Sequence, residues 1–287
     1  MEHASCIVCR NKHLKPLKAY SRAHLAKCSN CGMVFSKKIP TNEELTKIYT
    51  NYPRFIELPP LTIKRYNELL DKMESYRKTN NLLDLGCSNG LFLDCAKQRG
   101  WNVYGTEYAQ ESIDFCAKKN IRVFKSDQLP DDFYKKSFDI VTSFEVIEHI
   151  NNPNEDMAIV NKVLRIGGAF YFTTPNFNAL SRRLLKEKWN VIDYPEHLSY
   201  YTPSTIHYLL KQNGYKKDFL ITTGISFTRF SQSVNTQAVS ENVPVNDEEL
   251  RNKIEHNPIL SILKSSANFI LNLFKIGDSL KGFYVKQ

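Results

Sequence analysis

Acidic side chains end several predicted strands of this 287-residue chain, where they could bind the polar groups of a nucleoside. The first, Asp84, lies in the apolar run 82–85, and Gly86 and Gly90 follow it in a turn. Glycines let backbone approach a ligand closely because they carry no Cβ. Glu107 ends the next predicted strand, where a carboxylate can take both ribose hydroxyls. The pattern predicts a nucleoside-cofactor site at the carboxyl edge of a parallel sheet.

The elements that would position these residues alternate along 80–223. Strand-like runs and helical patterns follow one another, the strands at 82–85, 102–106, 121–125, 138–143, 169–173 and 219–223, and the helices at 91–99, 109–119, 155–163 and 203–212. This alternation predicts an α/β fold with a doubly wound, mostly parallel sheet. Residues 39–79 form a connector and helical lead-in. Residues 224–287 form a C-terminal extension with an amphipathic helix over 258–276 and a last strand over 281–286.

Two Cys-x2-Cys pairs predict a separate module over residues 1–38. The 18 residues between the pairs fit the spacing of a structural zinc site. Metal binding would supply much of the folding free energy of so small a module. Two disulfides are the alternative, which a cytosolic location disfavours. The predicted zinc-ribbon ligands are Cys6, Cys9, Cys28 and Cys31.

The net charge of +9 is concentrated near the N-terminus. Residues 1–50 hold nine Lys or Arg and three acidic residues, hence six of the nine net charges. Such a surface is either simply solvated or faces a phosphate-bearing partner. No apolar run reaches the roughly 20 residues that span a bilayer, and the first residues lack the pattern of a secretory signal. A cytoplasmic protein is expected.

Residues 80–223 resemble the class I S-adenosylmethionine-dependent methyltransferases. Asp84, Gly86, Ser88 and Gly90 match that family's Asp-x-Gly-x-Gly-x-Gly motif, with serine at the middle glycine. A nicotinamide-binding domain would instead need Gly-x-Gly-x-x-Gly. The resemblance implies a seven-stranded, Rossmann-like methyltransferase fold with S-adenosylmethionine as the cofactor.

The resemblance also implies which residues contact the cofactor. Gly86 and Gly90 would border its methionine part, Glu107 would hold the ribose, and Asp127 with the backbone of Gln128 would contact adenine. The stretch 144–146 would line the methionine side. The full implied set is Asp84, Gly86, Cys87, Ser88, Gly90, Glu107, Tyr108, Asp127, Gln128, Phe144 and Glu145.

Two histidines are candidates for the general base that takes a proton from the acceptor hydroxyl. A histidine with an unperturbed pKa of about 6.5 is mostly neutral at pH 7 and can accept that proton. His149 could instead be a packing group below the methionine site. His197 lies in a tyrosine-rich loop where an acceptor would enter, or it anchors that loop by hydrogen bonds.

The stretches 145–149, 164–168, 174–176 and 189–203 look like small-molecule and sugar methyltransferases, and the ribbon is similar to that of deoxysugar C-methyltransferases. The chain is too short for the extra C-terminal domain of those C-methyltransferases, which favours O-methylation. The expected acceptor is a hydroxyl of a sugar, a glycan precursor or a related metabolite, as in polysaccharide biosynthesis. The alternatives are a zinc-ribbon ribosomal RNA methyltransferase, despite the lack of an Asn-Pro-Pro-Tyr-type motif, and a non-catalytic binding protein.

The helix over 258–276 has three interpretations. It caps the sheet edge, it forms a homodimer contact, or it lies on a membrane surface with Lys264 and Lys275 near the headgroups. The third would place the protein at the inner face of the membrane as a peripheral protein.

Overall fold

The computed structural model describes all residues except 42, 46–47, 49–56, 127–128, 226–253 and 256. Its centre is a seven-stranded sheet in the order β10-β11-β8-β7-β4-β5-β6. The strands are β4 (Asn81–Leu85), β5 (Asn102–Glu107), β6 (Arg122–Lys125), β7 (Phe138–Phe144), β8 (Leu164–Pro175), β10 (Tyr215–Thr223) and β11 (Ser279–Lys286). Strand β11 runs antiparallel to both of its neighbours, and the other pairings are parallel. The predicted seven-stranded, mostly parallel α/β fold is confirmed.

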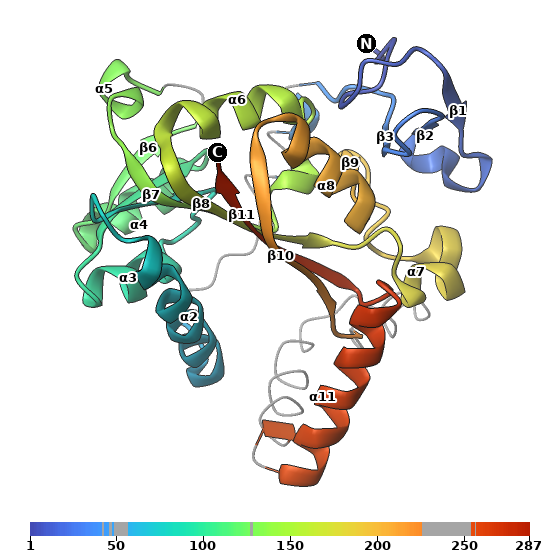
Figure 1. Cartoon of the computed structure of the whole chain (residues 1–287). Coiled ribbons are helices and arrows are strands. Elements are labelled where there is room, and N and C mark those ends of the chain that lie inside the picture. The colour runs from blue at the N-terminus through green and yellow to red at the C-terminus, as the bar shows by residue number, and fades with distance from the viewer. Residues whose placement is uncertain (42, 46–47, 49–56, 127–128, 226–253, 256) are drawn as a thin grey trace.

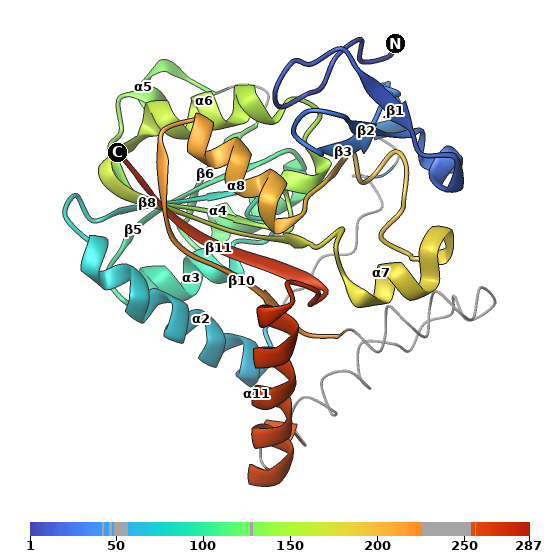
Figure 2. The ribbon, with the colours of Figure 1, turned by 45° about the vertical axis from the view of Figure 1, so that its right-hand side comes forward.

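Helices cover both faces of the sheet (Figures 1 and 2). One apolar core contains residues of α2 (Pro60–Met73), α3 (Leu91–Gln98) and α4 (Gln110–Lys118). The other contains residues of α5 (Asp131–Tyr134), α6 (Pro153–Val163) and α8 (Pro203–Gln212). Helix α8 starts sharply because Thr202 and Thr205 form a reciprocal capping box. Other helices within the described residues include η2 (Glu74–Tyr76), η3 (Ile147–His149), α7 (Leu180–Leu185), η4 (Lys186–Lys188) and α11 (Pro258–Leu273).

The N-terminal module contains β1 (Leu14–Pro16), the 3-10 helix η1 (Lys18–Ala23), β2 (Leu25–Cys28) and β3 (Val34–Ser36). Its sheet gains a fourth strand from far along the chain, β9 (Ser199–Tyr200), which pairs antiparallel with β3. Apolar side chains of the module join the core under α6 and α8, among them Ile7, Met33 and Phe35. The module is therefore packed against the large sheet domain.

A buried carboxylate joins three segments at the amino-terminal edge of the large sheet. Oδ2 of Asp139, near the start of β7, accepts hydrogen bonds from the backbone amides of residues 78–80 at 2.7–2.8 Å. Its Oδ1 accepts one from Nε of Arg165, in β8, at 2.5 Å. Since Asp139 is fully buried, these bonds replace the water that the carboxylate loses.

Strand β8 is longer than the sequence predicts, since it begins at Leu164 rather than 169. Leu164 pairs with Phe138, and an irregularity in register precedes the pairing of Ala169 with Ile140. Gly168 lies in this irregular part, where a Cβ would come within 3.0 Å of the Asp139 carbonyl oxygen. The glycines that the sequence analysis placed before the strand therefore lie inside it.

Candidate active site

A cavity of about 410 Å³ lies at the carboxyl ends of the parallel strands, beside the glycine turn that follows β4. Gly86 takes a φ of +65°, and a Cβ there would meet Val146 at 2.7 Å. Ser88 takes a φ of +46°, in the left-handed region that glycine prefers. The turn thus keeps a glycine-like path even though serine replaces the middle glycine.

Glu107, at the end of β5, is held toward this turn by backbone amides. Its Oε2 accepts a hydrogen bond from the Ser88 amide at 2.9 Å, and its Oε1 accepts from the amides of Tyr108 and Ala109 at 2.7 and 3.0 Å. A carboxylate offers about four acceptor sites. The three amides therefore fix its orientation and leave capacity for a ligand hydroxyl.

The predicted cofactor residues divide into three groups. Six of them line the cavity: Gly86, Ser88, Glu107, Tyr108, Phe144 and Glu145. Three others, Asp84, Cys87 and Gly90, lie outside the cavity lining. Asp127 and Gln128 lie outside the described residues, so their predicted adenine contact stays a prediction.

Asp84 supports the turn from beneath. Its buried Oδ1 accepts a hydrogen bond from the Thr142 hydroxyl at 2.7 Å. Burial raises the pKa of Asp84 to about 7, because the charged form loses its hydration. This carboxyl joins β4 to β7 inside the sheet.

The two candidate base histidines lie side by side, with ring centroids 4.9 Å apart. Nδ1 of His149 is 2.8 Å from the Glu196 carbonyl oxygen, and Nδ1 of His197 is 2.8 Å from that of Val191. A carbonyl can only accept, so both Nδ1 atoms carry the proton, and Nε2 of each neutral ring carries the lone pair. Burial lowers the pKa of His149, which keeps that ring neutral near pH 7.

A third group completes this cluster. A carboxylate oxygen of Glu148 and one ring nitrogen from each of His149 and His197 lie within 4.8 Å of one another. Thr174 donates a hydrogen bond to Oε2 of the buried Glu148 at 2.9 Å, which orients the carboxylate. The negative charge would stabilise an imidazolium formed on either ring.

The loop that carries His197 is attached to the η3 segment by hydrogen bonds. The Leu198 amide donates to the Glu148 carbonyl at 2.8 Å, and the Ser199 hydroxyl donates to that of Ile150 at 2.9 Å. The next residues enter β9, so the same loop also reaches the N-terminal module. His149 lines the cavity, whereas His197 lies outside the cavity lining; this attachment holds the His197 ring next to the His149 ring.

Asp156, in α6, is a site residue that the sequence analysis did not single out. It lines the cavity with Leu129, Phe133 and Met157, and burial raises its pKa to about 7. A neutral carboxyl can both donate and accept a hydrogen bond, which suits a polar ligand edge. Helical spacing was the available signal, since the position adjoins Met157 on the apolar face of 153–163.

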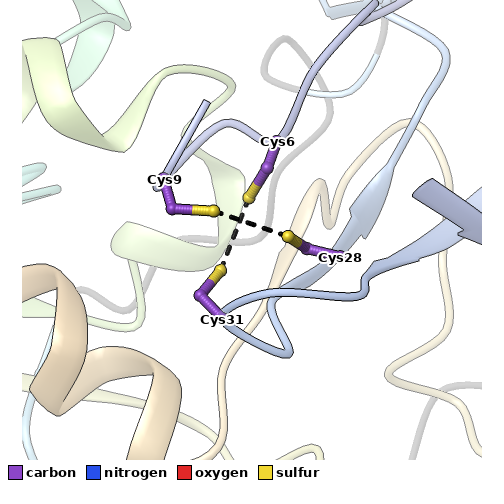
Figure 3. A group of neighbouring side chains, drawn as sticks. All are labelled: Cys6, Cys9, Cys28 and Cys31. Carbon is purple, nitrogen blue, oxygen red and sulfur yellow. Dashed lines mark hydrogen bonds between the residues drawn. The ribbon is translucent and has the colours of Figure 1, made fainter. Parts of the chain in front are cut away.

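The four N-terminal cysteines converge from two turns (Figure 3). Sγ of Cys6 is 3.6 Å from Sγ of Cys31, and Sγ of Cys9 is 3.5 Å from Sγ of Cys28. A Zn–S bond of about 2.3 Å gives a tetrahedral S–S edge of roughly 3.8 Å. The four sulfurs, none in a disulfide, thus fit a tetrahedral zinc ion.

Comparison with known proteins supports the resemblance. A family model described as a methyltransferase domain matches residues 57–218, more than half of the chain. The ubiquinone biosynthesis O-methyltransferase of Idiomarina loihiensis is 30% identical over 110 residues, which cover 35% of this chain and 44% of that protein. The enzyme of the same name from Rickettsia bellii is 32% identical over 123 residues, 39% of this chain and 50% of its own length. The chain thus spans about half the length of these curated relatives.

Solved structures share the fold. A SAM-dependent methyltransferase from Archaeoglobus fulgidus superposes with a TM-score of 0.52 at 18% identity, over 79% of this chain and 93% of that one. The family match, the strand order and the glycine turn at the cavity all indicate the same family. The chain belongs to the class I S-adenosylmethionine-dependent methyltransferase family.

Proposed function

We propose that the protein transfers a methyl group from S-adenosylmethionine to a hydroxyl of a small molecule, with His197 as the general base. The observation that carries this proposal is the pair of adjacent histidines, of which His149 lines the cavity, each with Nδ1 on a backbone carbonyl. That arrangement orients the His197 ring and gives Nε2 the lone pair. A base so oriented can serve an oxygen acceptor, whose proton must be removed.

The chain's own groups would act as follows. The bound cofactor supplies an electrophilic methyl group on a sulfonium. Nε2 of His197 would take the hydroxyl proton as the acceptor oxygen receives the methyl group that the cofactor would supply. Glu148 stabilises the imidazolium that results, and Glu107 holds the ribose so that the reacting atoms are in line.

Which class of molecule carries the acceptor hydroxyl is a separate question. The expectation of a sugar or glycan precursor finds no support among the curated relatives, whose names refer to ubiquinone biosynthesis. Both classes offer a hydroxyl, so both fit the proposed base. Labelled cofactor should be offered with sugar nucleotides, with hydroxylated aromatic rings and with RNA. Label in RNA would favour the RNA methyltransferase alternative.

The role of His197 is tested by His197→Ala. We expect kcat to fall by about 10²-fold or more, the usual contribution of a general base, while calorimetry shows an unchanged Kd for S-adenosylmethionine. His13→Ala, which removes an exposed histidine of the N-terminal module, is the control and should leave kcat intact. Unchanged turnover in His197→Ala would remove His197 from the mechanism. Absence of cofactor binding by the wild type would favour a non-catalytic binding protein.

We also propose that the four cysteines hold a structural zinc ion. Four thiolate ligands leave no open coordination position, so this metal would take no part in the reaction. The support for it is the convergence of the four sulfurs and the ligand spacing.

A further inference from the structure

Helix α11 attaches to the protein through its polar side. Oδ1 of Asn272 accepts a hydrogen bond from the Thr222 amide at 2.9 Å, and Oδ1 of Asn268 accepts one from the Gly224 amide at 2.8 Å. Leu271, between these asparagines, is the helix's one buried residue. Figures 1 and 2 show the helix projecting away from the large sheet below β10 and β11. Most surface helices pack their apolar side against the core, whereas α11 turns its polar side toward the protein.

The opposite side of α11 is apolar and exposed. At 100° per residue these side chains gather around the face that points away from Asn268. We call this set, together with the residue that follows the helix, the α11 apolar face: Ile259, Ile262, Leu263, Phe269, Ile270, Leu273 and Phe274, each between 52% and 71% exposed. Exposed patches of this kind mark interaction sites in stable proteins.

Basic residues lie at the C-terminal end of the apolar face. At the C-terminal end, the carbonyl of Lys275 accepts a hydrogen bond from Asn178, whose Oδ1 accepts one from Arg183 at 2.6 Å. Lys275 and Arg183 are both exposed. At the other end, the carboxylate of Glu255, just before the helix, pairs with Nζ of both Lys64 at 3.6 Å and Lys264 at 3.0 Å, so the basic side chains there are neutralised.

The single charged residue within α11 is Lys264, and it pairs with Glu255 at 3.0 Å, on the side away from the apolar face. The face therefore combines an uncharged apolar surface with one positive end. A layer of anionic headgroups over an acyl interior complements both parts.

We propose that the α11 apolar face docks onto an anionic lipid bilayer, with the helix lying in the plane of the interface. Its 16 residues give a length of about 24 Å. Within the described part of the chain, no helix combines the length and apolarity needed to cross a bilayer. Binding by insertion of one face is the mode that such a helix allows.

The test is sedimentation of the full chain with phosphatidylcholine vesicles that contain or lack phosphatidylglycerol. Wild type should pellet with the anionic vesicles, less at high salt. The triple variant Ile262→Ser, Ile270→Ser and Leu273→Ser should lose at least about tenfold in partitioning, because it removes apolar area that would be buried in the bilayer. Ile166→Ser, at another exposed isoleucine, is the matched control and should pellet like wild type.

Folding and oligomeric state are measured in parallel. All variants should melt like wild type because the altered side chains are exposed, and light scattering should give a monomer mass for each. The proposal is wrong if wild type stays in the supernatant with anionic vesicles, or if the triple variant still pellets. If wild type is a dimer and the triple variant is a monomer, the face binds a second copy of the chain and the bilayer proposal is wrong.

Discussion

At the scale of the residue, Asp156 is a carboxyl in an apolar part of the cavity wall. Its neighbours there include Phe133 and Met157, and burial raises its pKa from 3.8 to about 7. The folded protein therefore holds this proton more tightly than the unfolded chain does. Asp156 therefore contributes to the free energy of unfolding in full below about pH 4, and this contribution is lost as the pH rises toward 7.

We expect Asp156→Asn to remove this pH dependence. Without bound ligand, the variant should gain stability over wild type as the pH rises from 4 to 7, by about 1.4 kcal/mol for each pH unit that separates the folded and unfolded pKa values. Urea unfolding across this range measures the difference. Asp131→Asn, at an exposed position in α5, should follow wild type throughout. A difference between Asp156→Asn and wild type that does not change with pH would contradict the raised pKa.

The sequence predicts residues of the site where local spacing determines position. The glycine turn and Glu107 follow directly from strands that end where the pattern predicts, and the structure places Gly86, Ser88 and Glu107 at one cavity. Asp84 was harder to interpret, because its bond to Thr142 joins strands 58 residues apart in sequence. The sequence does not predict the Nδ1 hydrogen bonds of the two histidines either, because their acceptors are backbone carbonyls of a distant or irregular loop.

At the scale of the element, Asp139 determines how three segments meet at the amino-terminal edge of the sheet. It accepts three backbone amides from residues 78–80 and pairs with Arg165. Removing one partner of a buried pair leaves the other charge without compensation, which costs about 3–5 kcal/mol. The same kind of pair on the surface is worth about 0–1 kcal/mol.

Asp139→Asn should therefore lower the free energy of unfolding by about 3 kcal/mol or more. The chain offers a matched control in Asp132, which pairs with Arg122 at 2.9 Å with both side chains about half exposed. Asp132→Asn should change stability by less than about 1 kcal/mol. Denaturant unfolding measures both variants. If both variants lose a similar free energy of unfolding, the buried ion pair stabilises the fold no more than the surface pair does.

Most elements of the sheet domain were predictable because each carries its own period. Helix α8 matches its predicted range 203–212, and β4 differs from its prediction by one residue. Strand β9 was not predicted, because two residues are too few to show the alternation of a strand. Their strand conformation depends on pairing with β3. The early start of β8 likewise depends on Phe138 as a partner.

At the scale of the whole molecule, the N-terminal module and the large domain share their interior. Phe35 and Met33 join the core that contains Met157 and Ile206, and Val34 joins a core with Trp189. Loss of the proposed zinc should therefore weaken more than the module itself.

We expect Cys28→Ser to lose the equimolar zinc that mass spectrometry should find in wild type. Its melting temperature should fall, and kcat should fall more than cofactor affinity does, because the His197 loop pairs with the module through β9. Cys95→Ser, at a buried cysteine of α3, should keep its zinc. Wild-type protein free of metal, yet equally stable and active, would rule out the zinc proposal.

The pairing of β9 with β3 also limits how this protein can be recombined with others. The sequence predicts a module that ends at residue 38, but the edge strand of its sheet is Ser199–Tyr200. A graft of residues 1–38 onto another methyltransferase would carry an open sheet edge and leave behind Trp189, which is fully buried at the shared core. A graft that keeps the whole small sheet would therefore need a second piece of chain that includes β9, and the loop leading into β9 holds the proposed base.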